Sequence, residues 1–347
     1  MAWLFGDSFD FYNAAADMLL PGTPWSATTI GNAVTTTSRF GLGLSTTIAN
    51  VTNIVSNSFT NSTTIWVNFA FQLNLAMNGT TTQAYGFDLR DGTSIQCGVY
   101  VRQDGSIVLT SNGIGGTVLA TSSVLLPTGV SVWTHLQFKI VINNTTGSIE
   151  CRLNGKAVDD WNATGLNTRN GTVTAQVNNV VFKGAANNAS IDDFYVFNDQ
   201  GVAPNNWQGD VRAVQQMPTS DSSVTWSRSV GTTNFTEVDE LRENGDTDYV
   251  FTSTAGSADA YGVPGLATAP FFIVAVQTKM IARMDNVGPK TVKSRLNSGG
   301  TPVDSANLSL SSSYQWISQV NTVDPHTSAA WTGAAVAGVT IGPVAVL

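Results

Sequence analysis

Asp-Gly and Asn-Gly pairs recur in this chain between short segments of alternating hydrophobicity. Asp91-Gly92, Asp104-Gly105 and Asn154-Gly155 are such pairs, and they favour the tight turns that join antiparallel strands. Segments 64–73 and 133–142 alternate large apolar residues with small or polar ones, as half-buried strands do. Strands spaced about ten residues apart, with turn residues between them, predict a β-sandwich.

Composition also favours strands over helices. Only 12% of the residues are charged, against roughly 25% in an ordinary soluble protein. Thr and Val suit pleated strands, whereas Gly and Asn suit turns. The long runs of Ala, Glu, Lys and Leu that favour helices are missing. We therefore predict an all-β protein.

The chain is long enough for two domains, since it has 347 residues and a domain takes about 150. Residues 1–203 are predicted to form the first domain and residues 222–347 a second, smaller β-sandwich. Residues 204–221 are rich in Pro, Asn and Ser, which predicts a linker with one helical turn around 209–216. Further strands are expected at 85–89, 95–102, 106–110, 148–153, 180–183 and 190–197, and then at 223–227, 271–283, 291–297, 314–321 and 337–347.

Charge and hydrophobicity exclude several classes of partner. The net charge is −8 and no basic stripe is present, so nucleic acid is not an expected partner. No apolar stretch approaches the roughly 18 residues that cross a bilayer, so membrane insertion is not expected either. Residues 1–20 lack the positive start and apolar run of a secretory signal. We expect synthesis in the cytoplasm, with export only inside a larger assembly.

The two cysteines, Cys97 and Cys151, fall in separate predicted strands of the first domain. Thiols of cytosolic proteins stay reduced, which favours two small buried core residues. A disulfide across strands is the alternative. No His or Cys spacing indicates a zinc site, and no cofactor is expected.

The run 133–139 (WTHLQFK), followed by 147–155 (GSIECRLNG) and 190–197 (SIDDFYVF), resembles the central and last strands of concanavalin A-like (laminin-G-like) jelly rolls. Residues 9–12 with 39–41 resemble the start of such domains in phage structural proteins. The resemblance covers most of residues 5–200 and implies a jelly-roll sandwich for the first domain.

The second half resembles a small domain that recurs in phage virion and tail-associated proteins. The segments concerned are 226–228, 234–240 and 244–250, with 324–327 and 331–332. The two resemblances together imply a non-enzymatic virion structural protein: a head decoration, collar or tail appendage on the virion exterior that contacts other virion proteins. The alternative is a receptor- or carbohydrate-binding, adhesin-like protein that contacts a host-surface glycan.

A glycosidase needs two carboxyl groups that face the scissile bond. The first domain has a single glutamate, Glu150, and Asp88 and Asp91 flank a turn. Asp192 and Asp193 are adjacent, so they should point to opposite faces of a strand. The sequence therefore predicts no glycosidase site.

An esterase of the SGNH class is a more distant alternative. Gly6-Asp7-Ser8 resembles the nucleophile block of that class, and Asp324-Pro325-His326 lies near the end of the chain. The Asp-x-His spacing at 324–326 is one residue shorter than the Asp-x-x-His of that class. That class also has a parallel sheet flanked by helices, which is not expected here. We therefore predict that the chain is not an enzyme and has no catalytic residues.

Two further features have both a functional and a structural explanation. Asp246 and Asp248 lie in the acidic stretch 237–259 and are weak candidates for a metal site, but a solvated turn explains them as well. Trp66 and Trp133 could stack on sugars, although tryptophans in strand patterns usually belong to the core.

Self-association is expected because long stretches of this chain carry no charge. Segments 51–71 and 328–347 contain no charged residue, and sheet edges without charge are open to pairing with another chain. Closed symmetric assembly would cover such edges. Analogy with phage fibres and spikes suggests a trimer.

Overall fold

The computed structural model describes residues 3–28, 33–35, 38–40, 45–48, 53–74, 79–123, 126–127, 130–170, 174–184, 189–200, 206–268, 270, 272–285 and 290–346. The chain forms two compact units. The first comprises Met1–Leu19 and Pro24–Ala213, and the second Leu20–Thr23 and Val214–Leu347. The division into domains at 1–203 and 222–347, with a linker at 204–221, remains a prediction.

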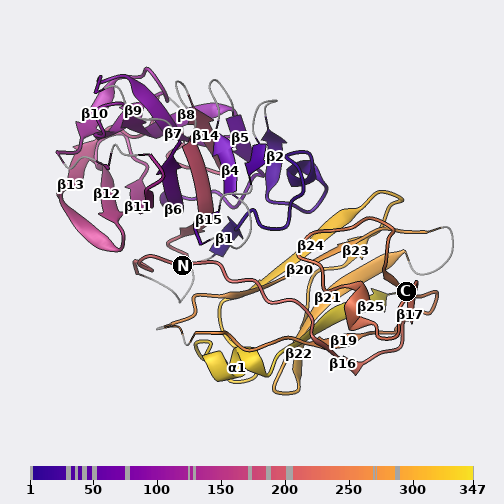
Figure 1. Ribbon diagram of the computed structural model, residues 1–347. Coiled ribbons are helices and arrows are strands. Elements are labelled where there is room, and N and C mark those ends of the chain that lie inside the picture. Colours follow the sequence, from indigo (N-terminus) through magenta and orange to yellow (C-terminus); the bar gives the residue numbers. More distant parts are fainter. Residues whose placement is uncertain are drawn as a thin grey trace. The chain divides into compact units, whose positions relative to one another are not determined.

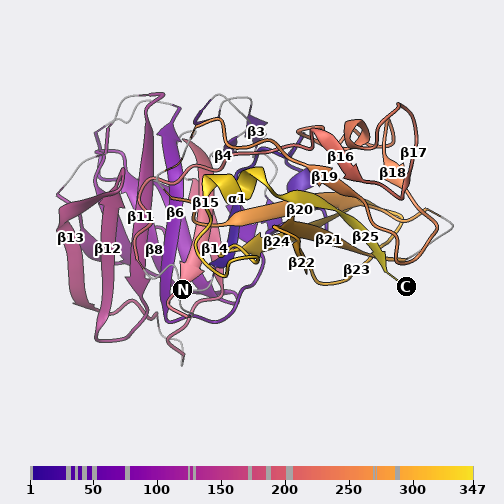
Figure 2. The ribbon, with the colours of Figure 1, turned by 90° about the horizontal axis from the view of Figure 1, so that it is seen from below.

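The first unit contains two antiparallel sheets, whose strands can be followed in Figures 1 and 2. One sheet has eight strands, with β1 (Trp3–Asp7) paired to β15. Its main order is β13 (Lys156–Leu166), β12 (Gly147–Leu153), β11 (Trp133–Val141), β6 (Thr64–Leu73), β15 (Ala189–Asn198), β4 (Ser45–Ile48) and β3 (Ala33–Thr35). The seven-stranded sheet has the order β10 (Val118–Thr121), β9 (Ile107–Ser111), β8 (Ser94–Arg102), β7 (Gln83–Asp91), β14 (Asn179–Gly184), β5 (Asn53–Ser56) and β2 (Trp25–Thr28).

Aromatic side chains from both sheets fill the core between them. Phe69 of β6 meets Phe182 of β14 edge to face, with ring centroids 5.2 Å apart, and Phe182 meets Phe194 at 4.9 Å. Phe87 of β7 and Phe138 of β11 lie 5.6 Å apart in the same cluster. The alternation in 64–73 and 133–142 thus places one face of each strand in this core, and the all-β sandwich prediction is confirmed.

The turns and cysteines of this unit follow from the sequence. Asn154 and Gly155 both have positive φ, 49° and 78°, as a two-residue hairpin turn between β12 and β13 requires.

Cys97 and Cys151 are buried, free thiols on different sheets. Burial raises the pKa of both thiols, so neither is poised to react.

A β-bulge in β15 corrects the expectation that Asp192 and Asp193 point to opposite faces. The register against β6 shifts between Asp192 and Tyr195, and Asp193 adopts a φ of 49°. Both carboxylates consequently reach Arg39: Asp192 accepts its backbone N–H at 2.9 Å, and Asp193 lies 3.3 Å from its guanidinium. An extra residue breaks the two-residue period on which the expectation rested.

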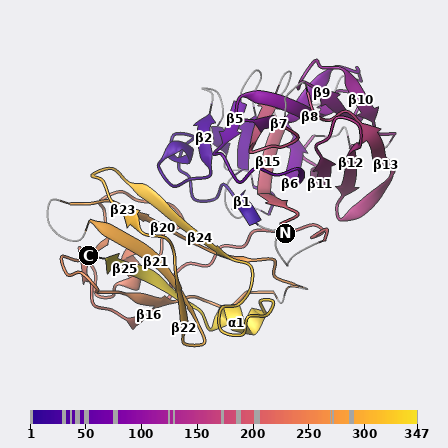
Figure 3. The same cartoon turned by 180° about the vertical axis from the view of Figure 1, so that it is seen from behind.

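The second unit is built on a six-stranded antiparallel sheet, seen with its neighbours in Figure 3. Its strands are β16 (Ser220–Ser223), β19 (Ala260–Gly262), β25 (Thr340–Val346), β21 (Thr291–Ser298), β22 (Thr301–Asp304) and β23 (Leu308–Ser309), with β23 paired to β21. Two-stranded sheets join β20 (Val276–Ala282) to β24 (Gln315–Asn321) and β17 (Ser227–Arg228) to β18 (Val250–Phe251). Short helical elements are η1 (Asp17–Leu19) in the first unit, and η2 (Phe235–Glu237) and α1 (Gly333–Ala337) in the second.

A second layer packs on this sheet through strand β20. The Ser294 hydroxyl of β21 donates to Thr278 Oγ1 of β20 at 3.2 Å. Leu296 is fully buried beside Trp331 in a small core that Val276 also contacts. The described part of this unit thus has two layers around a core of its own.

Three predicted strands of the second unit are shorter than expected. The 223–227 strand is interrupted because Thr225 and Trp226 donate their backbone N–H groups to the Asp259 carboxylate instead of to a neighbouring strand. The 271–283 strand begins only at Val276, opposite Asn321 of β24. The 337–347 segment starts as the end of helix α1, whose N-terminus is capped by the Thr332 side chain, and β25 follows from Thr340.

The helical turn expected around 209–216 is absent, since residues 211–219 have no helix or strand. Side chains of the eight-stranded sheet engage the backbone here. Ala213 donates its N–H to Asp193 at 2.8 Å, and the Gly209 carbonyl accepts from Tyr195. Among the described residues no helix is long and apolar enough to cross a membrane.

Candidate functional site

Residues 206–213, called the strap below, lie on the outer face of the eight-stranded sheet within the first unit. Trp207 and Val211 pack against a buried cluster of Trp66, Tyr195 and Phe197. The guanidinium of Arg152, on β12, stands 4.6 Å from the centre of the Trp207 ring. Contacts from β6, β12 and β15 thus hold the strap across several strands.

The aromatic residues beneath the strap form a ladder of nearly parallel rings. Trp3 and Tyr195 are stacked with centroids 5.8 Å apart, Tyr195 and Phe197 are 6.0 Å apart, and Phe197 and Trp66 are 5.5 Å apart. Trp66 is therefore buried on the outer face of the sheet, not in the core between the sheets. A ring whose face already stacks on a neighbour is a poor platform for a sugar. Trp133, at the start of β11, is half-buried.

A polar cluster lies beside this ladder on β11 and β6. Gln137 is fully buried and donates to Asn68 Oδ1 at 3.2 Å and to the Tyr195 hydroxyl at 3.4 Å. His135 is also fully buried and stacks on Tyr195. Neither ring nitrogen of His135 nor the Oε1 atom of Gln137 has a hydrogen-bond partner within the described ranges. Burial lowers the pKa of His135 to about 4, so this ring is neutral at pH 7.

Arg39 connects the bulge of β15 to the strap. Its side chain is 7% exposed, and Nη2 lies 2.6 Å from the Asp210 carboxylate of the strap. Burial and mutual repulsion raise the pKa of Asp192 to about 8, and burial raises that of Asp193 to about 6. Arg39 thus contacts three carboxyl groups: Asp193 and Asp210 through its guanidinium and Asp192 through its backbone N–H.

A second polar group, called the Asp91 rim below, comprises Asn61, Asp91, Thr174, Gln176 and Asn178. The Asp91 carboxylate accepts from the Thr174 hydroxyl at 2.7 Å and from the Gln176 amide at 3.1 and 3.2 Å. Asn178 donates to Asp91 at 3.4 Å and to Asn61 at 3.2 Å. Asn61 and Thr174 are exposed. Among the described residues, the hydrogen-bond partners of Asp91 are all neutral side chains.

The acidic residues weighed for a glycosidase have ordinary partners. Asp88 is fully buried and pairs with Arg90 at 2.9 Å and Lys183 at 3.1 Å, and it also accepts from the Tyr100 hydroxyl. Glu150 pairs with Lys139 on the neighbouring strand at 3.1 Å. Neighbouring cations favour the charged form of both carboxylates. A general acid instead needs an apolar environment that keeps its carboxyl group protonated.

Asp246 and Asp248 are not brought together around a cation site. Asp246 Oδ1 accepts from Arg283 at 2.8 and 3.1 Å and from the Tyr314 hydroxyl at 2.6 Å. The hydrogen bond from Tyr314 and the Arg283 guanidinium lower the pKa of Asp246. Asp248 accepts from Asn244 instead. Within the described parts of the chain, no three His, Cys, Asp or Glu side chains gather where they could share a metal ion.

The residues weighed for an esterase are used structurally. Asp7 accepts from the Tyr12 hydroxyl at 2.5 Å and the Trp25 indole at 2.7 Å. Asp324 accepts the backbone N–H of His326 at 3.0 Å and the Thr327 hydroxyl. The His326 ring lies against Thr301. Asp324 thus stabilises a turn through a backbone N–H and a hydroxyl group, whereas a catalytic dyad needs a carboxylate bonded to the histidine ring.

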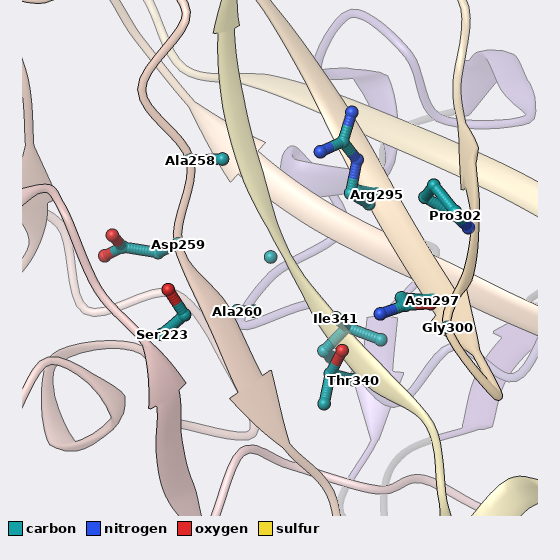
Figure 4. A pocket seen from close by; sticks show the side chains of 11 residues that line it. Ser223, Ala258, Asp259, Ala260, Arg295, Asn297, Gly300, Pro302, Thr340 and Ile341 are labelled. Carbon is teal, nitrogen blue, oxygen red and sulfur yellow. The ribbon is translucent and has the colours of Figure 1, made fainter.

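The second unit has a small pocket of about 260 Å³ on its six-stranded sheet (Figure 4). Arg295 and Asn297 of β21 lie beside Thr340 of the neighbouring strand β25. The floor is open because Gly342 has no side chain: a Cβ there would lie 2.1 Å from the Asp259 carbonyl oxygen. Arg295 is bound to Asp304 through two bonds of 2.6 and 2.9 Å, so the pocket presents few free charges.

Sequence reasoning did not identify Arg39, His135 and Asp210 as one cluster. These residues are far apart in the chain, and only the β15 bulge and the course of the strap bring them together. Asp91 was noticed only as a turn residue. A usable signal was the row of Thr, Gln and Asn at 174–178, whose spacing of two places three polar groups on one side of an extended segment.

No protein-family model and no curated protein matches this sequence. Several solved structures are similar in part. Cellulose induced protein, Cip1, has 14% identity and a TM-score of 0.39 over 56% of this chain and 96% of its own. A GH131 β-glucanase catalytic domain from Podospora anserina has 11% identity and a TM-score of 0.38 over 60% of this chain and 100% of its own. The Emp46p carbohydrate recognition domain has 10% identity and a TM-score of 0.37 over 58% of this chain and 100% of its own.

Proposed function

We propose that this chain is a non-enzymatic carbohydrate-binding protein whose Asp91 rim recognises sugar hydroxyl groups. The observation that supports this proposal is a carboxylate, at the last residue of β7, that is surrounded by hydroxyl and amide side chains. Sugar hydroxyls both donate and accept hydrogen bonds, and carboxylate and amide groups offer the complementary atoms. Because these groups already fix one another, little side-chain entropy is lost when a ligand binds.

Replacing Asp91 by asparagine is expected to weaken glycan binding by about tenfold or more, because a charge-assisted acceptor of hydroxyl groups is lost. Gln176→Ala should also weaken binding, since Gln176 holds the carboxylate. Glycan arrays identify a ligand, and calorimetry measures its affinity. Asp104→Asn is the matched control, because Asp104 stabilises another turn of the same sheet through Ser106. Equal loss in that control, or no glycan bound by the native chain, would refute the proposal.

A second function, as a virion structural protein, is favoured by strand β10. This strand ends the seven-stranded sheet, carries no charged residue and leaves Val118 40% exposed. Natural proteins usually guard such edges with charge. Together with the phage-like segments of the second half, this edge supports assembly with other virion subunits or with copies of the chain itself.

Light scattering of the purified chain at micromolar concentration is expected to show an oligomer, with a trimer as the expected form. Val118→Lys should shift it toward the monomer, because a charge at an edge strand opposes pairing. Val230→Lys places the same charge at another exposed valine and should leave the oligomer intact. A monomeric native chain would contradict self-association through this edge.

A further inference from the structure

We propose that the strap is an internal occupant of a binding site for small carboxylate-bearing molecules, in which the Asp210 carboxylate holds the place of the ligand's carboxylate against Arg39. This site lies on the outer face of the eight-stranded sheet and is separate from the Asp91 rim. The proposal goes beyond carbohydrate binding at the rim and does not depend on it.

The first support is a set of buried polar atoms without hydrogen bonds around Tyr195, the residue that the strap contacts through Gly209. His135 and Gln137 are both 0% exposed, and the two imidazole nitrogens and Gln137 Oε1 lack hydrogen bonds within the described chain. Trp66 is 7% exposed, and its indole N–H also lacks a hydrogen-bond partner within the described chain. Buried unpaired polar groups destabilise a fold, so their concentration here suggests a surface shaped for another occupant.

The second support is the position of Asp210. Its carboxylate is 37% exposed, whereas the Arg39 side chain that it contacts at 2.6 Å is 7% exposed. The guanidinium is therefore buried, and the carboxylate approaches it from the solvent side. Arg39 is fixed from behind by Asp193, which gives it the rigid geometry that carboxylate recognition needs.

The third support is the kind of contact that holds the strap. Residues 206–213 pair with no strand of the sheet. Side-chain contacts hold them instead: the Arg39–Asp210 ion pair, the Arg152–Trp207 and Arg212–Phe40 contacts, the packing of Trp207 and Val211 on the aromatic ladder, and single hydrogen bonds at Gly209, Val211 and Ala213. The strap can therefore leave without breaking any strand pairing of the sheet.

The chemistry of the exposed site would then define its ligand. Exchanging the Asp210 carboxylate for a ligand carboxylate leaves the charge beside Arg39 unchanged. The neutral His135 ring offers one donor and one acceptor, and Gln137 Oε1 offers a further acceptor. A carboxylate with hydroxyl groups beside it satisfies all of these atoms, as in a uronic acid.

Asp210→Asn tests the proposal, with glucuronate as the probe and glucose as the analogue without a carboxylate. Removal of the strap's charge should enlarge the open fraction and so raise glucuronate affinity by about tenfold over the native chain. Asp199→Asn makes the same change at an exposed aspartate and should have no effect. Adding Arg39→Gln to Asp210→Asn should abolish the gain. Calorimetry reports each affinity, and circular dichroism checks that each variant is folded.

Trp207→Ala gives an independent opening of the strap without a change of charge and should also raise glucuronate affinity. Equal glucuronate affinity in the native chain and in both opened variants, or no binding in any of them, would overturn the proposal. Glucose bound as well as glucuronate would also overturn it. Asp91→Asn should leave glucuronate binding unchanged, so failure at this site and failure at the rim are separate results.

Discussion

Replacing Asp259 by alanine is expected to destabilise the second unit by about 3–5 kcal/mol, the cost of leaving several buried donors unpaired. Asp259 is 1% exposed. It accepts from the backbone of Thr225 and Trp226 at 2.6 and 2.8 Å, and from the side chains of Asn234 and Tyr261 at 2.9 and 2.7 Å. One carboxylate thus joins an interrupted strand, a turn and β19.

Hydrogen exchange measured by mass spectrometry would locate this effect. Amides of residues 220–262 should lose protection in Asp259→Ala, while those of the first unit keep it. Asp239→Ala removes an exposed carboxylate from the same acidic stretch and should change little. If both variants exchange alike, the carboxylate of Asp259 does not organise this region.

A loss of about 3–5 kcal/mol is also expected for Phe182→Ala in the first unit, because a buried aromatic ring would be replaced by a cavity. Phe182 is fully buried and contacts Phe69, Phe87 and Phe194. These rings come from both sheets, so the cavity would open between the layers. Denaturant unfolding measures the change.

Two further variants calibrate that result. Phe182→Leu keeps most of the buried volume and should lose roughly 1–1.5 kcal/mol. Phe40→Ala removes a ring that is 44% exposed and should cost less than the core deletion. A Phe182→Ala variant as stable as Phe40→Ala would mean that the two sheets do not share this core.

Much of the first sandwich could be predicted from periodicity and turn residues. The expected strand at 64–73 coincides with β6, and 95–102 and 148–153 nearly coincide with β8 and β12. These strands alternate strongly because one face is buried. Strands β2 and β5 were not predicted, since four residues are too few to show a period.

The polar clusters were beyond sequence reasoning for a different reason. The alternation in 133–142 makes His135 and Gln137 polar members of a half-buried strand, and such members normally face water. Here they lie beneath the strap, whose course depends on Arg39 and on the bulge at Asp193. A bulge adds one residue to a strand without a distinctive sequence pattern, so the convergence at Arg39 could not be derived.

In the second unit, side chains replaced expected backbone pairing. Asp259 takes the N–H groups that would have extended β16, and the helix capped by Thr332 runs into the first residue of the strand expected at 337–347, so that β25 begins only at Thr340. Such local side-chain bonds compete with sheet ladders. The bonds to Asp259 come from residues more than 30 positions earlier in the chain. The start of helix α1 depends on the side chain of a single residue, Thr332.

The position of β15 has a consequence for biosynthesis. β15 is the last strand of the first unit, yet it lies between β6 and β4 and also pairs with β1. One side of β6, an uncharged strand, therefore remains open until the ribosome has made β15. At about 5–20 residues per second this interval is on the order of ten seconds. Translation speed and chaperone supply should consequently govern how much soluble chain a host produces, because an open, uncharged strand edge aggregates readily.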